Sequence, residues 1–258
     1  MREISSKDNK IIKYTAKLQS SAKFRREEGC FVSEGLRVCL EAVSSGASIE
    51  YVLVTREAID KYKDTLSPLL ECGCEVYVTD KKVMSVACDT QTPQGVVCVL
   101  KTLDNNIDFD TINNKYVFLE NIQDPSNLGT ILRTADALGI CGVIMTKDCC
   151  DIYSPKVCRG AMGALFRVPF MTVDDAVRFI SDFNETGTSY AAVVREAESL
   201  CDCSFDGKTL IAIGNEGNGL TPETACACHK RVTIPMNGVA ESLNAAIAAG
   251  ILMWEMVK

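Results

Sequence analysis

Residues 115–146 read KYVFLENIQDPSNLGTILRTADALGICGVIMT. The stretch holds two short apolar runs, at 116–120 and 141–146, separated by a turn and a helical pattern. Apolar runs bounded by turn residues are typical of buried strands, whereas apolar residues three and four positions apart indicate a helix. We expect Asn127 to cap this helix, because asparagine is favoured at that position. The predicted buried stripe of the helix is Leu128, Ile131, Leu132 and Ala135.

The same alternation continues towards the C-terminus. Apolar or amphipathic runs follow at 155–162, 172–183, 190–194, 209–214 and 231–235, and a last helix begins at Ser242. Strand and helix in alternation predict an α/β fold with a parallel sheet covered by helices on both faces. Ligands of such sheets bind in loops beyond the carboxyl ends of the strands. This directs attention to the loops after Glu120, Ile213 and Pro235.

The first hundred residues alternate in a similar way. Helical patterns cover 7–19 and 34–45, and short β-rich runs cover 51–55, 75–79 and 96–100. A polar stretch without sustained periodicity follows at 101–114, which is typical of a linker. The sequence therefore predicts a small α/β domain at 1–103, a linker at 104–114 and a second domain at 115–258.

Composition places the chain among globular proteins. Its 258 residues are 47% hydrophobic and 24% charged, which suffices for a buried core in each part. The first eight residues have no apolar run behind their charges, so we expect a cytoplasmic protein without a secretory signal. The longest apolar run, 245–254, is too short to cross a bilayer and predicts a buried helix. No membrane span is expected.

The 14 cysteines do not predict disulfides, since the chain is long enough to fold without them. None of the three Cys-x-Cys pairs has the Cys-x-x-Cys spacing of zinc sites, and His229 is the single histidine. We expect reduced thiols and no metal.

The charge distribution is uneven. The formal net charge is −7, the wrong sign for a protein that binds nucleic acid chiefly by neutralising phosphates. Residues 1–30, however, carry eight basic and four acidic side chains, a local charge of +4. This segment fits a localised RNA contact and, equally well, a solvated helix face.

Each of the three loops has a plain structural interpretation when taken alone. Arg133 lies off the buried stripe of its helix and could be a surface arginine paired with Asp136 or Asp124, a kind of pair that contributes little. The glycines of 211–223 follow the order Gly-x-x-Gly-x-Gly, which is neither the dinucleotide-binding order nor a phosphate-binding loop. Ser242 is a natural N-cap for the last helix.

Taken together, the loops resemble the three signature motifs of the SpoU/TrmH family of RNA methyltransferases. The matching stretches are Asn127-x-Gly129-x-x-x-Arg133, Gly214-x-Glu216-Gly217-x-Gly219, and Ile234-Pro235-Met236 to Ser242-Leu243-Asn244. The resemblance extends to the N-terminal part, where Arg25-x-x-x-Gly29-x-Phe31-x-x-Glu34-Gly35 and Thr92-Pro93-Gln94-Gly95 look like the substrate-binding domain of such enzymes, a small α/β domain similar to RNA-binding ribosomal proteins.

The resemblance implies a catalytic domain of the SPOUT kind, folded as a deep trefoil knot that forms an S-adenosylmethionine site. It implies transfer of the methyl group to a ribose 2′-hydroxyl of structured RNA, with large-subunit (23S) ribosomal RNA favoured and transfer RNA as the alternative. The implied cofactor-binding residues are Ile213, Gly214, Asn215, Glu216, Gly219, Ile234, Met236 and Leu243. The implied catalytic residues are Arg133, Asn127, Glu216, Ser242 and Asn244.

Arg133 is the central catalytic residue that the resemblance implies. Because arginine keeps its proton in proteins, we expect it to bind the ribose oxygen and the adjacent phosphate and not to act as the base. For Asn244 a structural role is favoured over a chemical one. The expected RNA-binding residues are Lys10, Lys17, Lys23, Arg25, Arg26 and Arg133.

The resemblance also implies a homodimer, with the C-terminal helix as part of its interface. Two other functions compete with the methyltransferase. A catalytically silent RNA-binding protein of the same fold is disfavoured by the intact Asn127 and Arg133. A nucleotide-binding oxidoreductase is disfavoured by the glycine order.

Overall fold

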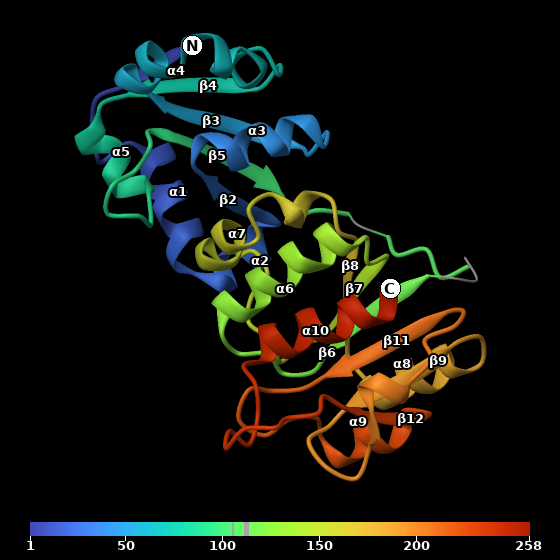
Figure 1. The fold of residues 1–258 in the computed structure, drawn as a ribbon. Helices are drawn as coiled ribbons and strands as arrows, with labels where there is room; N and C mark the ends of the chain where they lie inside the picture. The colour runs from blue at the N-terminus through green and yellow to red at the C-terminus, as the bar shows by residue number, and fades with distance from the viewer. Residues whose placement is uncertain (105, 111–113) are drawn as a thin grey trace. The chain divides into compact units, whose positions relative to one another are not determined.

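A parallel sheet forms the centre of the C-terminal part of the chain (Figure 1). The computed structural model describes residues 1–104, 106–110 and 114–258. The chain divides into two compact units. Unit 1 consists of Met1–Asp104 and Asp151–Arg167, and unit 2 of Asn105–Cys150 and Val168–Lys258. Each unit is described by itself.

Unit 2 contains seven strands in the order β10-β12-β9-β11-β6-β7-β8, and all its recorded pairings are parallel. The strands are β6 (Lys115–Leu119), β7 (Gly142–Thr146), β8 (Phe170–Val173), β9 (Thr188–Ala192), β10 (Glu198–Ser199), β11 (Thr209–Ile213) and β12 (Lys230–Thr233). The helices are α6 (Pro125–Leu138), α8 (Ala176–Asn184), α9 (Pro222–Ala227) and α10 (Ala245–Val257), with a 3₁₀ turn at Leu200–Asp202. The predicted α/β class and parallel sheet are confirmed. The predicted knot stays a prediction.

Two helix pairs cover this sheet. Tyr116 and Phe118 of β6 point towards α8, where they contact Phe183 and Phe179. Because successive side chains of a strand point to opposite faces, Val117 and Leu119 point to the other side. α6 and α10 pack on each other and contact strands of this sheet. The buried runs predicted from the sequence are therefore the central strands, since apolar layers cover them on both sides.

The N-caps of α6 and α10 differ from the prediction. Asp124, not Asn127, caps α6, and its carboxylate accepts from the Ser126 amide at 2.8 Å. The following Pro125 takes the first helical position, where a missing N–H costs nothing. α10 begins after Asn244, not at Ser242, and the Asn244 amide oxygen accepts from Ala246 and Ile247. Both asparagines of the motifs consequently lie at or near helix starts.

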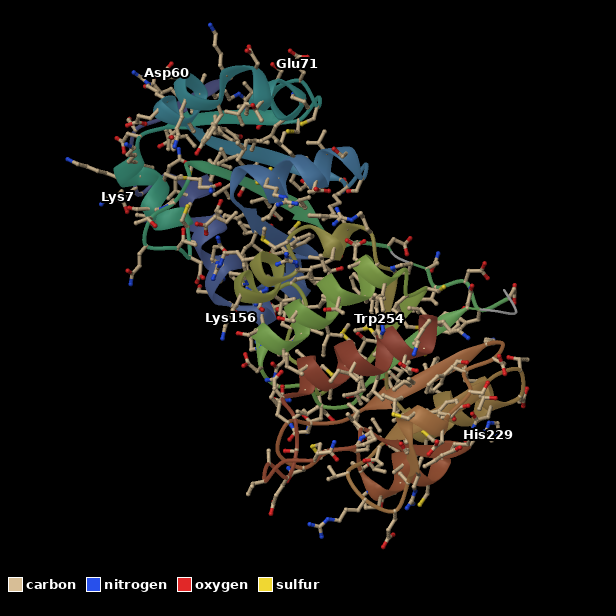
Figure 2. All side chains as sticks on the ribbon, in the orientation of Figure 1. Lys7, Asp60, Glu71, Lys156, His229 and Trp254 are labelled. Atoms are coloured by element: carbon tan, nitrogen blue, oxygen red, sulfur yellow. The ribbon has the colours of Figure 1, made fainter. Side chains whose placement is uncertain are left out.

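α10 is apolar apart from Glu255, but it is buried on only one side. Leu252, Met253 and Met256 are buried, whereas Ile247 and Trp254 are 55% and 59% exposed. Figure 2 shows the Trp254 side chain on this helix. The helix that was predicted to be buried is therefore buried along one side. No helix among the described residues is long and apolar enough to cross a membrane.

Unit 1 contains a five-stranded sheet in the order β1-β4-β3-β5-β2, with β5 antiparallel to β3 and β2. Its strands are β1 (Arg2–Ile4), β2 (Cys30–Glu34), β3 (Ile49–Thr55), β4 (Glu75–Thr79) and β5 (Val96–Lys101). Its helices are α1 (Lys10–Ser20), α2 (Ala22–Glu28), α3 (Leu36–Ser44), α4 (Arg56–Leu70), α5 (Lys81–Ala87) and α7 (Pro155–Gly160), with a 3₁₀ turn at Ala164–Phe166.

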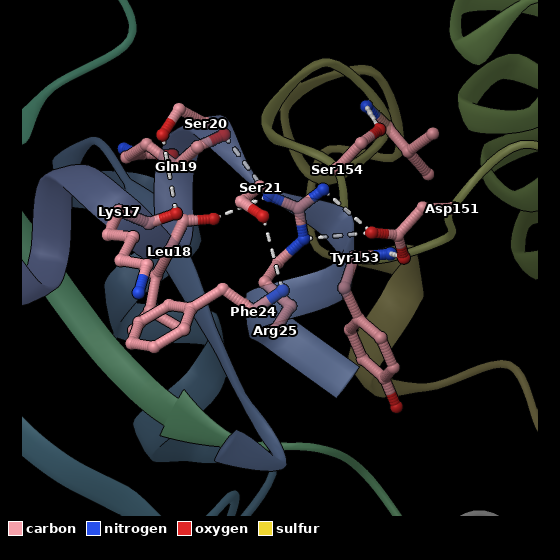
Figure 3. A network of polar contacts seen from close by, with 11 residues as sticks. Lys17, Leu18, Gln19, Ser20, Ser21, Phe24, Arg25, Asp151, Tyr153 and Ser154 are labelled. Atoms are coloured by element: carbon pink, nitrogen blue, oxygen red, sulfur yellow. Dashed lines mark hydrogen bonds and ion pairs between the residues drawn. The ribbon is translucent and has the colours of Figure 1, made fainter. Parts of the chain in front are cut away.

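Asp151–Arg167, which lies between β7 and β8 in the sequence, packs with unit 1. The Arg25 side chain, 5% exposed, forms an ion pair with Asp151 at 2.7 Å and donates to the carbonyls of Leu18 and Gln19 (Figure 3). The Phe31 ring contacts Tyr153 at 4.6 Å between centroids. Local sequence patterns do not indicate this arrangement, because Arg25 and Asp151, like Phe31 and Tyr153, lie more than a hundred residues apart along the chain.

Candidate functional site

The three motif loops meet at one edge of the sheet of unit 2. Because β6, β11 and β12 run parallel, their carboxyl ends lie at the same edge, and Leu119 pairs with Ile213 there. A cavity of about 330 Å³ opens at this edge. All eight residues predicted to bind the cofactor line it: Ile213, Gly214, Asn215, Glu216, Gly219, Ile234, Met236 and Leu243. The predicted catalytic Ser242 also lines it.

Sequence reasoning missed one wall of the cavity. Ala192, Val193 and Val194, at the end of β9, belong to the lining. β9 lies between β11 and β12, so its carboxyl end faces the same edge. The sequence contains a signal for this wall, because it predicts a strand of the parallel sheet at 190–194. The loop after that strand must lie at the same edge as the three motif loops.

Gly214 has no room for a side chain. A Cβ atom at this position would lie 2.1 Å from the Gly219 carbonyl carbon and from the Leu220 nitrogen. The loop folds back on itself, since Asn215 and Gly219 exchange backbone hydrogen bonds of 3.0 and 2.9 Å. The Asn215 amide group also donates to the Asn121 carbonyl at 2.8 Å. The glycine motif is therefore a closed turn held against the loop after β6.

A chain of hydrogen bonds connects all three motifs. The Glu216 carboxylate accepts from the Asn127 side chain at 2.9 Å. Asn127 is 6% exposed, and its amide oxygen accepts from the Asn244 side chain at 2.9 Å. Asn244 in turn caps α10. Three predicted catalytic residues thus form one network, in which Asn127 links the other two.

Glu216 is held as an anion by this network. Partial burial alone would raise its pKa, but hydrogen bonds from Asn127 and from the backbone amides of Glu216, Asp124 and Gln123 outweigh burial and lower the pKa. The Gln123 and Asp124 amides donate at 3.2 and 3.1 Å. The carboxylate therefore connects the glycine turn to the loop and helix after β6 through three hydrogen bonds.

Arg133 extends from an exposed position of α6. Within the described part of the chain, no hydrogen bond or ion pair to its guanidinium is recorded, and the surface pair with Asp136 or Asp124 is not among the salt bridges. An arginine without a carboxylate partner keeps its five N–H groups available for a phosphate or a hydroxyl.

The predicted RNA-binding residues of unit 1 divide into two groups. Lys10, Lys17, Lys23 and Arg26 are exposed on α1 and α2. Arg25 is not, because its guanidinium is buried against Asp151 and two backbone carbonyls. The contact of Arg25 with RNA stays a prediction, and in this structure its guanidinium binds Asp151 instead of facing solvent.

The cysteines are all free thiols, and several are buried. Burial raises the pKa of Cys149, which also contacts the loop after β6 by accepting from the Ile122 amide at 3.3 Å. Across the residues with described positions, no group of three or more histidine, cysteine or acidic side chains is placed to hold a metal ion.

Comparison with known proteins gives matches to both parts of the chain. The profile of the SpoU rRNA Methylase family matches residues 114–254, more than half of the chain. The chain belongs to this family. The MRM3-like substrate binding domain matches residues 9–98.

Relatives of this SpoU methylase are similar over nearly their whole length. An uncharacterized tRNA/rRNA methyltransferase of Synechocystis is 31% identical over 98% of the chain and 92% of the relative. A 23S rRNA (guanosine(2553)-2′-O)-methyltransferase of Bacillus subtilis is 27% identical, with 99% of both chains covered. The crystal structure of an AdoMet-bound rRNA methyltransferase from Sinorhizobium meliloti has a TM-score of 0.88 at 27% identity, covering 99% of this chain and 97% of the other.

Proposed function

We propose that this SpoU methylase transfers a methyl group from S-adenosylmethionine to a ribose 2′-hydroxyl of large-subunit ribosomal RNA. The observation that carries the proposal is the convergence of three motif loops on one cavity, with Glu216, Asn127 and Asn244 in a single hydrogen-bond network beside it. The names of the relatives supply the reaction and the class of RNA.

The cavity residues fit S-adenosylmethionine. Ile213, Ile234 and Leu243 offer apolar walls for an adenine ring, and the glycines expose backbone amides and carbonyls that can bind its edge. Among the described residues, the lining of the cavity contains no lysine or arginine, which suits a cofactor that carries a positive sulfonium. When bound, the cofactor supplies an electrophilic methyl group. The chain must then place a ribose oxygen in line with it.

Arg133 is the residue that we assign to the ribose and its neighbouring phosphate. Its guanidinium stabilises negative charge that develops on the 2′-oxygen, because a planar fork can hold two oxygens at once. The 2′-hydroxyl proton passes to a phosphate oxygen or to water, since arginine does not accept it. Asn127, held between Glu216 and Asn244, fixes the start of the helix that carries Arg133.

The reaction is tested on purified protein with tritiated S-adenosylmethionine and RNA. Arg133→Lys should lower kcat by about 100-fold or more, because a lysine cannot replace the fork. Its dissociation constant for S-adenosylmethionine should stay unchanged. Arg178→Lys, at an exposed site on α8, is the matched control. A turnover of Arg133→Lys near that of the wild type would reject the role of the fork.

The target nucleotide is identified by mapping 2′-O-methyl groups in cellular RNA with and without the gene. Loss of one site in large-subunit ribosomal RNA is the expected result. Loss of a site in transfer RNA alone would replace the proposed substrate by the alternative. No lost site, together with no activity in vitro, would favour an RNA-binding protein without turnover.

RNA binding is assigned to unit 1, by resemblance and by the exposed Lys10, Lys17, Lys23 and Arg26. The assembly that we propose is a homodimer formed through α10. Ile247, Ile251 and Trp254 are exposed on this helix at intervals of four and three residues and therefore share one face. Such an apolar stripe is typical of a surface that another protein covers.

A further inference from the structure

Glu120 is a buried carboxylate that the proposed reaction leaves without a role. It follows the last residue of β6 and is 7% exposed. It accepts from the Thr221 backbone amide at 2.7 Å and from the Thr221 hydroxyl at 2.9 Å. The Thr224 hydroxyl donates to it as well. Burying a carboxylate costs free energy unless hydrogen-bond donors surround it. These hydrogen bonds therefore indicate that Glu120 has a specific structural role.

The donors to Glu120 all lie at the far end of the glycine turn. Thr221 directly follows residues 214–220 and caps α9, its hydroxyl accepting from the Thr224 amide at 3.2 Å. The near end of the turn is fixed by the sheet, because Ile213 pairs with Leu119. Glu120 is the next residue after Leu119. Leu119 at the end of β6 and Glu120 directly after it therefore hold the two ends of one turn.

The spacing of these two anchors matters because the turn is tight. Gly214 and Leu220 lie so close that even a Cβ on Gly214 would overlap the Leu220 nitrogen. If Thr221 moved away from Glu120, Leu220 would move with it and the turn would open beside Gly214. Both Gly214 and Leu220 line the cavity, whereas Glu120, Thr221 and Thr224 do not.

We propose that Glu120 is a positioning residue, which acts through Thr221 and Thr224 to keep residues 214–220 in the conformation that binds S-adenosylmethionine. The inference rests on the proposed location of the cofactor. It predicts a selective defect. Loss of Glu120 should weaken cofactor binding and leave the RNA-binding surface of unit 1 and the reaction of the loaded enzyme unchanged.

The test uses the full chain and calorimetric titration with S-adenosylmethionine. Glu120→Ala should weaken binding about tenfold or more, the effect of removing hydrogen bonds to a charged group. Glu120→Gln, which keeps one acceptor oxygen, should weaken binding less. Thr221→Val should act in the same direction, Thr221→Ser should restore binding, and Thr221→Val in the Glu120→Ala background should add little. Glu223→Gln, an exposed carboxylate on the first turn of α9, is the matched control.

Steady-state kinetics supply a readout that a general loss of stability would not give. The KM for S-adenosylmethionine should rise with the dissociation constant, while kcat at saturating cofactor and the KM for RNA should stay within about twofold of the wild type. Faster hydrogen exchange should be confined to residues 214–224. A parallel loss in kcat, both KM values and exchange protection throughout unit 2 would overturn the inference.

Gly214→Ala separates the inference from the cofactor site on which it rests. If Gly214→Ala abolishes binding and both Glu120 variants bind within about twofold of the wild type, the positioning role is wrong and the site stands. If Gly214→Ala binds normally, the site is wrong and the inference falls with it. If Glu120→Ala does not fold, Glu120→Gln and Thr221→Val decide by the same criteria.

Discussion

Side chains in this SpoU methylase gain their roles from partners that are distant in the sequence. Glu216 illustrates this, because its donors Asn127, Gln123 and Asp124 come from the loop and helix after β6. Its pKa lies below the ordinary value of 4.5 despite partial burial. A lowered pKa means that the folded protein favours the ionised form. The Glu216 carboxylate therefore stabilises the fold at every pH at which it is charged.

The pH dependence of unfolding tests the Glu216 network. The contribution of Glu216 should be fully present above pH 4.5 and should be lost as the pH falls through its lowered pKa. The difference in free energy of unfolding between wild type and Glu216→Gln should therefore be constant at neutral pH and shrink in acid. Urea unfolding at several pH values measures it. A difference that grew on acidification would contradict the assignment.

Arg25 is the second residue whose role depends on a distant partner. Its side chain and that of Asp151 are 5% and 17% exposed. Arg25→Met should lower the free energy of unfolding by about 3 kcal/mol, because it leaves the Asp151 carboxylate without its charged partner and removes the guanidinium donor from the carbonyls of Leu18 and Gln19. Arg26→Met, next to it but exposed, should change stability by no more than about 0.5 kcal/mol. Urea unfolding of both variants makes the comparison, and equal effects would contradict the buried role.

At the scale of helices and strands, the sequence predicted most of what the structure contains. Sequence patterns locate β3, β4, β5 and the central strands of unit 2 to within two residues of their bounds. A short buried apolar run between turn residues is compatible with few structures other than a strand. β2 was missed, since its CFVSE sequence merges into the helical pattern that follows. α4, α5 and α9 were missed as well.

The helix starts show where local sequence is insufficient. Asp124-Pro125 was a usable signal for the cap of α6, because proline favours the first helical position. Ser242 and Asn244 are both good caps by residue type, but Asn244 accepts from the Ala246 and Ile247 amides and also donates to Asn127. In the same way, Arg25 looked like an RNA contact and Glu120 like an ordinary strand end, because the ion-pair partner of Arg25 and the donors to Glu120 lie more than a hundred residues away.

α10 carries a prediction about assembly. Its exposed Ile247 and Trp254 form a stripe that a second copy of the chain would cover. The double variant Ile247→Glu/Trp254→Glu should therefore be monomeric, because each glutamate would place a charge inside an apolar interface. Light scattering coupled to gel filtration measures the mass. Val177→Glu, at an isolated exposed valine on α8, should leave the mass unchanged. A dimer that persists in the double variant would move the interface elsewhere.

At the scale of the whole molecule, the backbone passes between the two units more often than the single predicted linker at 104–114 suggests. The backbone passes from one unit to the other after Asp104, after Cys150 and after Arg167. The predicted division at 103 and 115 describes the first passage and includes neither of the others. Local sequence patterns could not include them, because Asp151–Arg167 meets its partners Arg25 and Phe31 only in the folded chain.

A truncation experiment tests this arrangement. Residues 105–258 alone should still bind S-adenosylmethionine but should fail to methylate RNA, since they lack the assigned RNA-binding unit. The fragment should also bind a hydrophobic dye, because Tyr153 and Phe166 have lost the Phe31 ring that they contact. Replacing 151–167 by a short Gly-Ser linker should remove dye binding. Full RNA methylation by the fragment would contradict the division of labour.

The passage of Asp151–Arg167 through unit 1 constrains how genes of this kind can recombine. A chimera that joins the first hundred residues of one homologue to the catalytic half of another would pair an Arg25 and a Phe31 with a foreign 151–167 segment. Exchange of substrate specificity between relatives should therefore succeed when this short internal segment is transplanted together with the N-terminal half, and fail when the crossover follows the apparent domain boundary.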